Sequence, residues 1–188
     1  MAAPIGPGGT LFLPAGEAEP FAGSTVVAAQ TLPFATAFYS GTLTSVVLAG
    51  DTTNPLGGLT FVYIMRNDAT SANSLARLTV NGYAGWGTDA SWSTLFPGID
   101  PLFIDRQANG DSLGFSFSNA LGHSLITPGA SSAVLIIQTN APWYTNTIAN
   151  VIDGAVTQVD TYAPAIPTPG AAVLAATGLV VASRRRRN

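Results

Sequence analysis

Residues 109–118 read Asn-Gly-Asp-Ser-Leu-Gly-Phe-Ser-Phe-Ser, and this stretch decides the fold class. Asn109-Gly110 is a strong signal for a hairpin turn, because both residues tolerate a positive φ angle. Leu113, Phe115 and Phe117 then alternate with small or polar residues, which is the period of an antiparallel strand with one buried face. The stretch therefore predicts a β-hairpin. Asp153-Gly154, between Val151-Ile152 and Val156, predicts another turn.

Further strand-like runs, separated by turns, extend in both directions from this hairpin. Ser24 to Ala29 and Thr36 to Leu48 are rich in Val, Thr, Phe and Tyr, and Leu59 to Met65 is a compact apolar run. Ala133 to Gln138 has the composition of a central strand buried on both faces. About seven to nine short strands of this kind predict an all-β fold, an antiparallel β-sandwich, over residues 24–163.

The composition narrows the classes of function open to this domain. Only 9% of the residues are charged, and the chain has no cysteine, which excludes disulfides and thiolate chemistry. Residues 1–183 hold three arginines against ten acidic residues, so we expect no binding of nucleic acid. Residues 1–23 are rich in Pro and Gly and lack the features of a secretory signal, so they are expected to form an irregular leader, with any signal peptide outside this numbering. Within this leader, Thr10 to Leu13 is a candidate for a short edge strand.

The chain changes character over residues 164–188. A proline-rich linker leads into an uncharged apolar stretch, Ala171 to Ala182, which is expected to form a short helix. Gly170 to Ser183 would span only about 21 Å as a helix, whereas a hydrocarbon core is about 30 Å thick. The stretch is followed by four arginines that would stop translocation: Arg184, Arg185, Arg186 and Arg187. These features predict a transient membrane segment, with an ordinary short membrane anchor as the alternative.

The order of proline motif, apolar stretch and arginine run resembles the PEP-CTERM sorting signal of bacterial exosortase substrates. The resemblance covers Ile166 to Arg187, and the motif consists of Pro167, Thr168, Pro169 and Gly170. Thr168 stands where the family's name has Glu, which leaves the identity of the sorting enzyme open. The resemblance implies export to the bacterial envelope, surface or matrix, and processing by an integral-membrane cysteine transpeptidase. It also implies an association with exopolysaccharide-producing cells.

The domain itself offers few candidates for chemistry, and we expect neither an enzyme nor a cofactor. His123 is the only histidine and stands near no nucleophile motif, so a structural role is favoured. Asp105, Asn109 and Asp111 are a weak calcium candidate, because oxygen ligands at alternate positions, Asp105, Gln107 and Asn109, precede Gly110. A polar hairpin turn explains these residues better.

Three tryptophans are candidates for a sugar-binding platform, since sugar rings stack on indole faces: Trp86, Trp92 and Trp143. Core packing accounts for aromatic residues in a β-sandwich equally well. The sequence therefore predicts a surface or matrix structural protein delivered by its tail, with a carbohydrate-binding surface module as the alternative.

Overall fold

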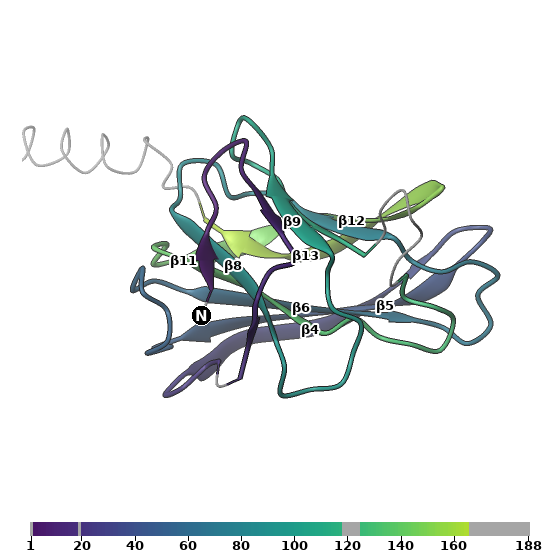
Figure 1. The fold of residues 1–188 in the computed structure, drawn as a ribbon, viewed down its shortest axis with the longest axis horizontal. Coiled ribbons are helices and arrows are strands. Elements are labelled where there is room, and N and C mark those ends of the chain that lie inside the picture. The colour runs from purple at the N-terminus through teal and green to yellow at the C-terminus, as the bar shows by residue number, and fades with distance from the viewer. Residues whose placement is uncertain (1, 19, 118–124, 166–188) are drawn as a thin grey trace, which may run out of the picture.

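The structure is a computed structural model that describes residues 2–18, 20–117 and 125–165. These residues form two β-sheets that share one core, and they contain no helix long and apolar enough to cross a membrane. Figure 1 shows β4, β5 and β6 running below β9, β12 and β13. The predicted all-β class with antiparallel sheets is confirmed. The expected linker and apolar helix over residues 166–188 lie outside the described residues.

The first sheet has seven strands. Its order is β1 (Ala3–Pro4), β8 (Thr88–Ser93), β11 (Val134–Thr139), β6 (Thr60–Asn67), β5 (Ser40–Ala49) and β4 (Thr25–Ala35), and β3 (Gly16–Glu17) pairs in parallel with β8. Every residue of β11 is buried, as expected for a central strand covered on both faces. Gln138 of β11 lies opposite Asp89 of β8.

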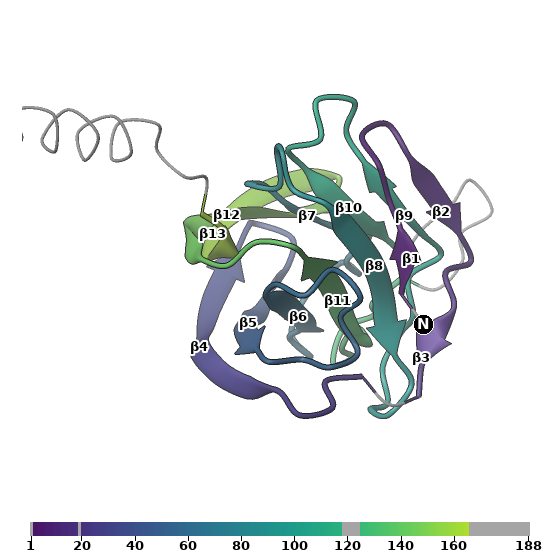
Figure 2. The same ribbon diagram turned by 90° about the vertical axis from the view of Figure 1, so that its left-hand side faces the viewer.

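The second sheet has six strands, all paired antiparallel. Its order is β13 (Ala155–Pro164), β12 (Tyr144–Asp153), β7 (Arg77–Val80), β10 (Leu113–Ser116), β9 (Phe103–Arg106) and β2 (Thr10–Phe12). The end-on view in Figure 2 shows the strands arranged around the interior.

Two predicted turns have the expected geometry. β9 and β10 form the predicted hairpin, in which Arg106 lies opposite Leu113 and Gly110 has a φ of +74°. Gly154, with a φ of +65°, joins β12 to β13. Both positions use the left-handed region that glycine occupies without steric cost.

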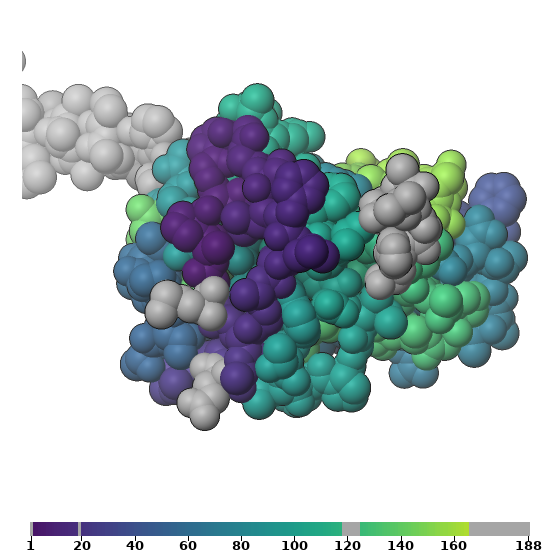
Figure 3. Space-filling model, in the orientation of Figure 1, coloured from purple at the N-terminus to yellow at the C-terminus, as the bar shows by residue number. Residues whose placement is uncertain are grey.

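The N-terminal segment differs from the expected irregular leader. It contributes β1, β2 and β3, which raises the described strands to thirteen, above the expected seven to nine. Backbone hydrogen bonds tie it down, among them Ile5 N to the Thr88 carbonyl at 2.9 Å. Figure 3 shows these purple residues laid across one face of the molecule. β2 falls on the expected edge strand Thr10 to Leu13, whereas β1 and β3 have two residues each and are too short to show a hydrophobic period.

The shared core is built from large apolar side chains of both sheets. Phe61 and Tyr63 of β6 and Leu78 of β7 are completely buried, and so is Phe115 of β10. The ring of Tyr83 packs edge-on against Phe61 with centroids 5.9 Å apart. This packing fixes the inner face of β6, so the alternate residues of that strand are left on the opposite face of the sheet.

Candidate functional site

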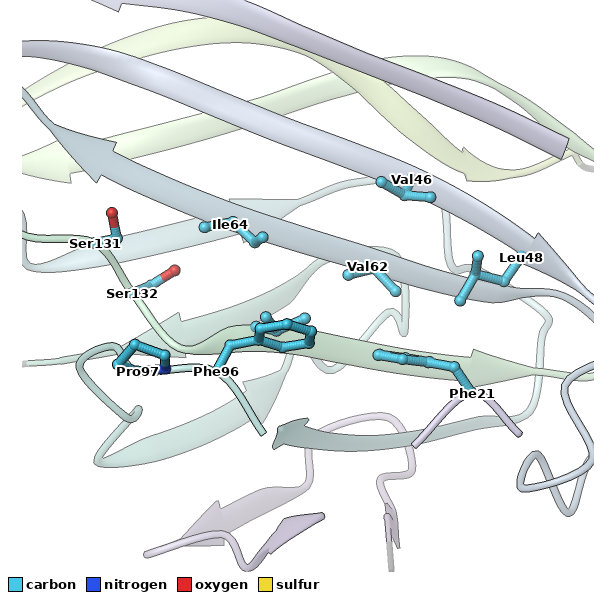
Figure 4. A pocket seen from close by; sticks show the side chains of 10 residues that line it. Phe21, Val46, Leu48, Val62, Ile64, Phe96, Pro97, Ser131 and Ser132 are labelled. Atoms are coloured by element: carbon cyan, nitrogen blue, oxygen red, sulfur yellow. The ribbon is translucent and has the colours of Figure 1, made fainter. Parts of the chain in front are cut away.

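A pocket of about 500 Å³ lies on the outer face of the seven-stranded sheet. Its floor is entirely aliphatic and is formed by Val46 and Leu48 of β5, Val62 and Ile64 of β6, and Val134 of β11. These side chains point away from the main core and form a second, smaller apolar cluster. Figure 4 shows the pocket from close by.

Two phenylalanines from loops form the opposite wall. Figure 4 shows Phe21 and Phe96 lying across the pocket from Val46 and Leu48. Phe96 is 55% exposed although it is a large apolar side chain. An exposed aromatic ring above an aliphatic floor is a common feature of sites for apolar ligands.

The backbone of Phe21 is strained. Its φ is +71°, a value that a residue with a bulky side chain rarely adopts and that costs of order 1–3 kcal/mol. The adjoining loop holds the segment in place, because Thr52 donates from both N and Oγ1 to the Ala22 carbonyl, each at 2.9 Å. Thr53 Oγ1 also accepts a bond from Phe21 N at 3.4 Å. The fold thus holds the Phe21 ring over the sheet in a backbone conformation that is unfavourable in free energy.

One end of the pocket is polar. Ser131 and Ser132 line it, and the Ser132 hydroxyl accepts a bond from Met65 N at 3.0 Å. Arg66 follows Ile64 on the outer face of β6, and its backbone forms a bridge with Ser131. The side chain of Arg66 is exposed.

Arg66 differs from the other two arginines of the described residues. Arg77 forms an ion pair with Asp105, with Nη1 and Oδ1 2.7 Å apart. Arg106 is 4% exposed and donates only to neutral acceptors. Within the described ranges, no carboxylate forms an ion pair with Arg66. Within these ranges its charge therefore has no ion-pair partner, and its backbone lies two residues beyond Ile64, which lines the pocket.

A buried acidic pair lies on the same face of this sheet. Glu17 accepts a hydrogen bond from the Ser91 hydroxyl, and Asp89 is 5% exposed. Burial raises the pKa of the Asp89 carboxyl, and the charge of Glu17 raises it further. Two carboxylates do not make a metal centre: among the residues that the structure describes, no group of three or more His, Cys, Asp or Glu is placed to hold a metal ion.

The calcium candidate residues are engaged in separate contacts within the hairpin. Asp105 binds Arg77, Asn109 Oδ1 accepts a bond from Asp111 N at 3.0 Å, and Asp111 Oδ1 accepts one from Gly82 N at 3.2 Å. These contacts match the polar hairpin turn that the sequence favours at this position.

The three tryptophans lie in different environments. Trp92 is partly buried and its indole nitrogen donates to the Pro14 carbonyl at 2.8 Å. The indole nitrogen of Trp86 is buried, and its carbonyl accepts a bond from Arg106 at 2.9 Å. Trp143 is 70% exposed, so its ring is the one of the three that is free to stack on a ligand.

His123 and the sorting-tail residues Pro167 to Arg187 lie outside the described residues. The apolar pocket is thus the best-formed candidate site in the described part of the chain. No protein-family model, no curated protein and no solved structure matches this chain.

Proposed function

We propose that this chain is an exported, non-catalytic β-domain protein that its C-terminal tail delivers to the bacterial surface or matrix. The observation that carries the proposal is the order of three elements in residues 166–188: a Pro-Thr-Pro-Gly motif, an uncharged apolar stretch and four arginines. This order resembles the PEP-CTERM signal. The β-rich body is the cargo in this proposal, and the tail is the substrate of a membrane transpeptidase.

The mechanism has three steps. After export, the apolar stretch enters the membrane, and the arginines hold its end on the cytoplasmic side. The sorting enzyme then cuts within Pro167 to Gly170, and the freed end passes to an acceptor. The position of the last strand supports this order, because β13 ends at Pro164 and Ala165 N donates to the Trp143 carbonyl at 3.0 Å. Cleavage at the motif would therefore leave every described strand in place.

Intact-mass analysis of the protein recovered from its native host tests the proposal. We expect a mature form that ends close to Pro169, because the segment that follows is too short for a durable span. Replacing all four arginines, Arg184 to Arg187, with serine should abolish this form, since the segment would no longer stop in the membrane.

Replacing Arg77 with serine is the matched control, because this arginine lies in the domain and should not affect processing. A full-length membrane form ending in Asn188 would contradict the proposal and would assign the tail to an ordinary anchor.

Binding of envelope polysaccharide is the second candidate function, and the exposure of Trp143 favours it. The neighbouring Tyr144 is 39% exposed and packs edge-on against Tyr162, with ring centroids 5.5 Å apart. The paired tyrosine rings would support a sugar stacked on the indole.

We expect Trp143→Ala to weaken binding on an array of envelope polysaccharides by up to about tenfold, because a stacked ring contributes about 0.5–1.5 kcal/mol. Phe38→Ala is the matched control, since Phe38 is another exposed aromatic residue, at 54%. Absence of binding by the unsubstituted protein to every polysaccharide would reject this second function.

A further inference from the structure

We propose that the pocket on the outer face of the seven-stranded sheet binds a free, unbranched fatty acid. The acyl chain would lie between the aliphatic floor and the rings of Phe21 and Phe96, and the carboxylate would bind Arg66. This inference concerns the domain and does not depend on how the chain is delivered.

The pocket has the size and lining that an acyl chain requires. Its volume of about 500 Å³ falls within the range of small-molecule sites. Eight of its ten lining residues are apolar, and none is charged. The pocket is elongated in Figure 4, from Leu48 and Phe21 at one end to Ser131 and Pro97 at the other. An unbranched apolar chain fits a lining of this kind without burying an unpaired polar group.

The strained segment at Phe21 points to a ligand in its own right. A strained backbone conformation persists only where the surrounding structure enforces it, and such residues gather at ligand clamps. Here the loop from Asp51 to Thr53 enforces it through the hydrogen bonds to Phe21 and Ala22. The consequence is an aromatic ring that packs against the Leu48 and Val62 cluster and forms one wall of the pocket.

The polar end of the pocket selects the head group. Ile64 lines the pocket, and Arg66 is the next residue of β6 on the same face, about 7 Å further along the strand. The Ser131 hydroxyl lies on the neighbouring segment at the same level. A guanidinium beside a hydroxyl binds a carboxylate through charge-assisted hydrogen bonds, which are stronger than those to a neutral group.

The charge distribution favours an anion at this end and nowhere else on the described surface. Residues 1–183 hold ten acidic residues, which repel anions, and only three arginines. Two of these arginines are used internally, as described above, which leaves Arg66. An alcohol or hydrocarbon would fill the apolar part equally well but would gain nothing from Arg66.

Photolabelling of the full chain tests the proposal. The protein is illuminated with a dodecanoate that carries a diazirine on its chain, and the labelled peptides are identified by mass spectrometry. We expect the label on peptides that contain Phe21, Val62 to Ile64, and Phe96. Dodecanoate should suppress this labelling at about tenfold lower concentration than dodecan-1-ol, because a charge-assisted hydrogen bond adds to the shared apolar contacts.

Substitutions at exposed residues distinguish the contribution of Arg66 from that of the apolar part of the site. Arg66→Gln should remove the tenfold preference for dodecanoate while leaving competition by dodecan-1-ol unchanged, and Arg66→Lys should keep part of the preference. Phe96→Ala should weaken competition by both compounds. Leu95→Ala is the matched control, because Leu95 is also 55% exposed but does not line the pocket.

Several results would overturn the proposal. They include labelling confined to residues 171–182, equal competition by dodecanoate and dodecan-1-ol, and an effect of Leu95→Ala as large as that of Phe96→Ala. Phospholipid vesicles that compete better than free dodecanoate would also overturn it, because they would assign the pocket to a membrane lipid.

Discussion

Replacing Arg106 with methionine is expected to lower the free energy of unfolding by about 3–5 kcal/mol, an effect large enough to unfold many domains of this size. The guanidinium is 4% exposed and donates five hydrogen bonds. The acceptors are the carbonyls of Ile5, Tyr83, Trp86 and Gly110 and the hydroxyl of Thr88, at 2.6–3.1 Å. Methionine keeps the apolar stem but removes all five bonds, and of these acceptors the Ile5 and Tyr83 carbonyls keep the Thr88 hydroxyl and Trp86 N as donors.

Loss of the Arg106 hydrogen bonds should also loosen contacts between segments, because Arg106 joins segments that are distant in the sequence. It connects the hairpin turn after β9 with the N-terminal segment at Ile5 and with the loop before β8. Chemical denaturation followed by tryptophan fluorescence would measure the change.

Arg77→Met is the matched control for Arg106→Met. Its ion pair with Asp105 is partly exposed, with side-chain exposures of 25% and 27%, and should contribute about 1 kcal/mol or less. The prediction would be contradicted if Arg106→Met lowered the free energy of unfolding by no more than Arg77→Met does.

Stability is expected to fall steeply once the pH rises above about 10, the ordinary pKa of tyrosine. Tyr63 and Tyr83 are completely buried, with their hydroxyls 2.7 Å apart. Burial raises the pKa of both hydroxyls well above the ordinary value. A raised pKa in the folded state means that the folded chain keeps protons that the unfolded chain loses, so the stabilisation present below pH 10 is lost as the pH rises further.

The expected slope is about 1.4 kcal/mol per pH unit for each tyrosine, or about 2.7 kcal/mol per pH unit for the pair. The Tyr63 hydroxyl donates its proton to the Tyr162 carbonyl at 2.6 Å, so the Tyr83 hydroxyl must donate to Tyr63. Tyr83→Phe therefore removes one ionisable group while the bond to Tyr162 survives, and it should lower the slope by about 1.4 kcal/mol per pH unit.

Denaturation curves recorded between pH 8 and pH 11.5 would measure these slopes. Tyr144→Phe is the matched control, because the Tyr144 ring is 39% exposed, and this variant should follow the curve of the unsubstituted chain. An unfolding free energy that stays constant across this range would contradict the assignment of Tyr63 and Tyr83 as the groups that control alkaline stability.

The central part of the fold could be predicted from local patterns. Asn109-Gly110 predicts the turn between β9 and β10, and the composition of Ala133 to Gln138 predicts a strand covered on both faces. The edge strand β2 was indicated by Thr10 to Leu13, but the two-residue strands β1 and β3 could not be predicted, because they exist only through their pairing with β8, more than seventy positions along the chain.

The candidate site could be predicted only in part from the sequence. The run from Leu59 to Met65 is apolar at almost every position, which indicates that both faces of this strand contact other groups. The pattern does not tell whether another sheet or a ligand covers the second face. That depends on where the loops carrying Phe21 and Phe96 lie, and those loops have no period that fixes their course.

The sequence by itself determined the β class, the two glycine turns and the order of elements in the tail. Each of these depends on the φ and ψ preferences of neighbouring residues or on the spacing of apolar side chains along one segment. The tertiary structure alone decided that Arg106 is buried, that Trp143 is exposed and that Arg66, which no carboxylate of the described residues pairs with, follows a strand residue lining an apolar pocket. These outcomes depend on which distant segments pack together, because burial and pairing are properties of the assembled sheets and not of any single strand.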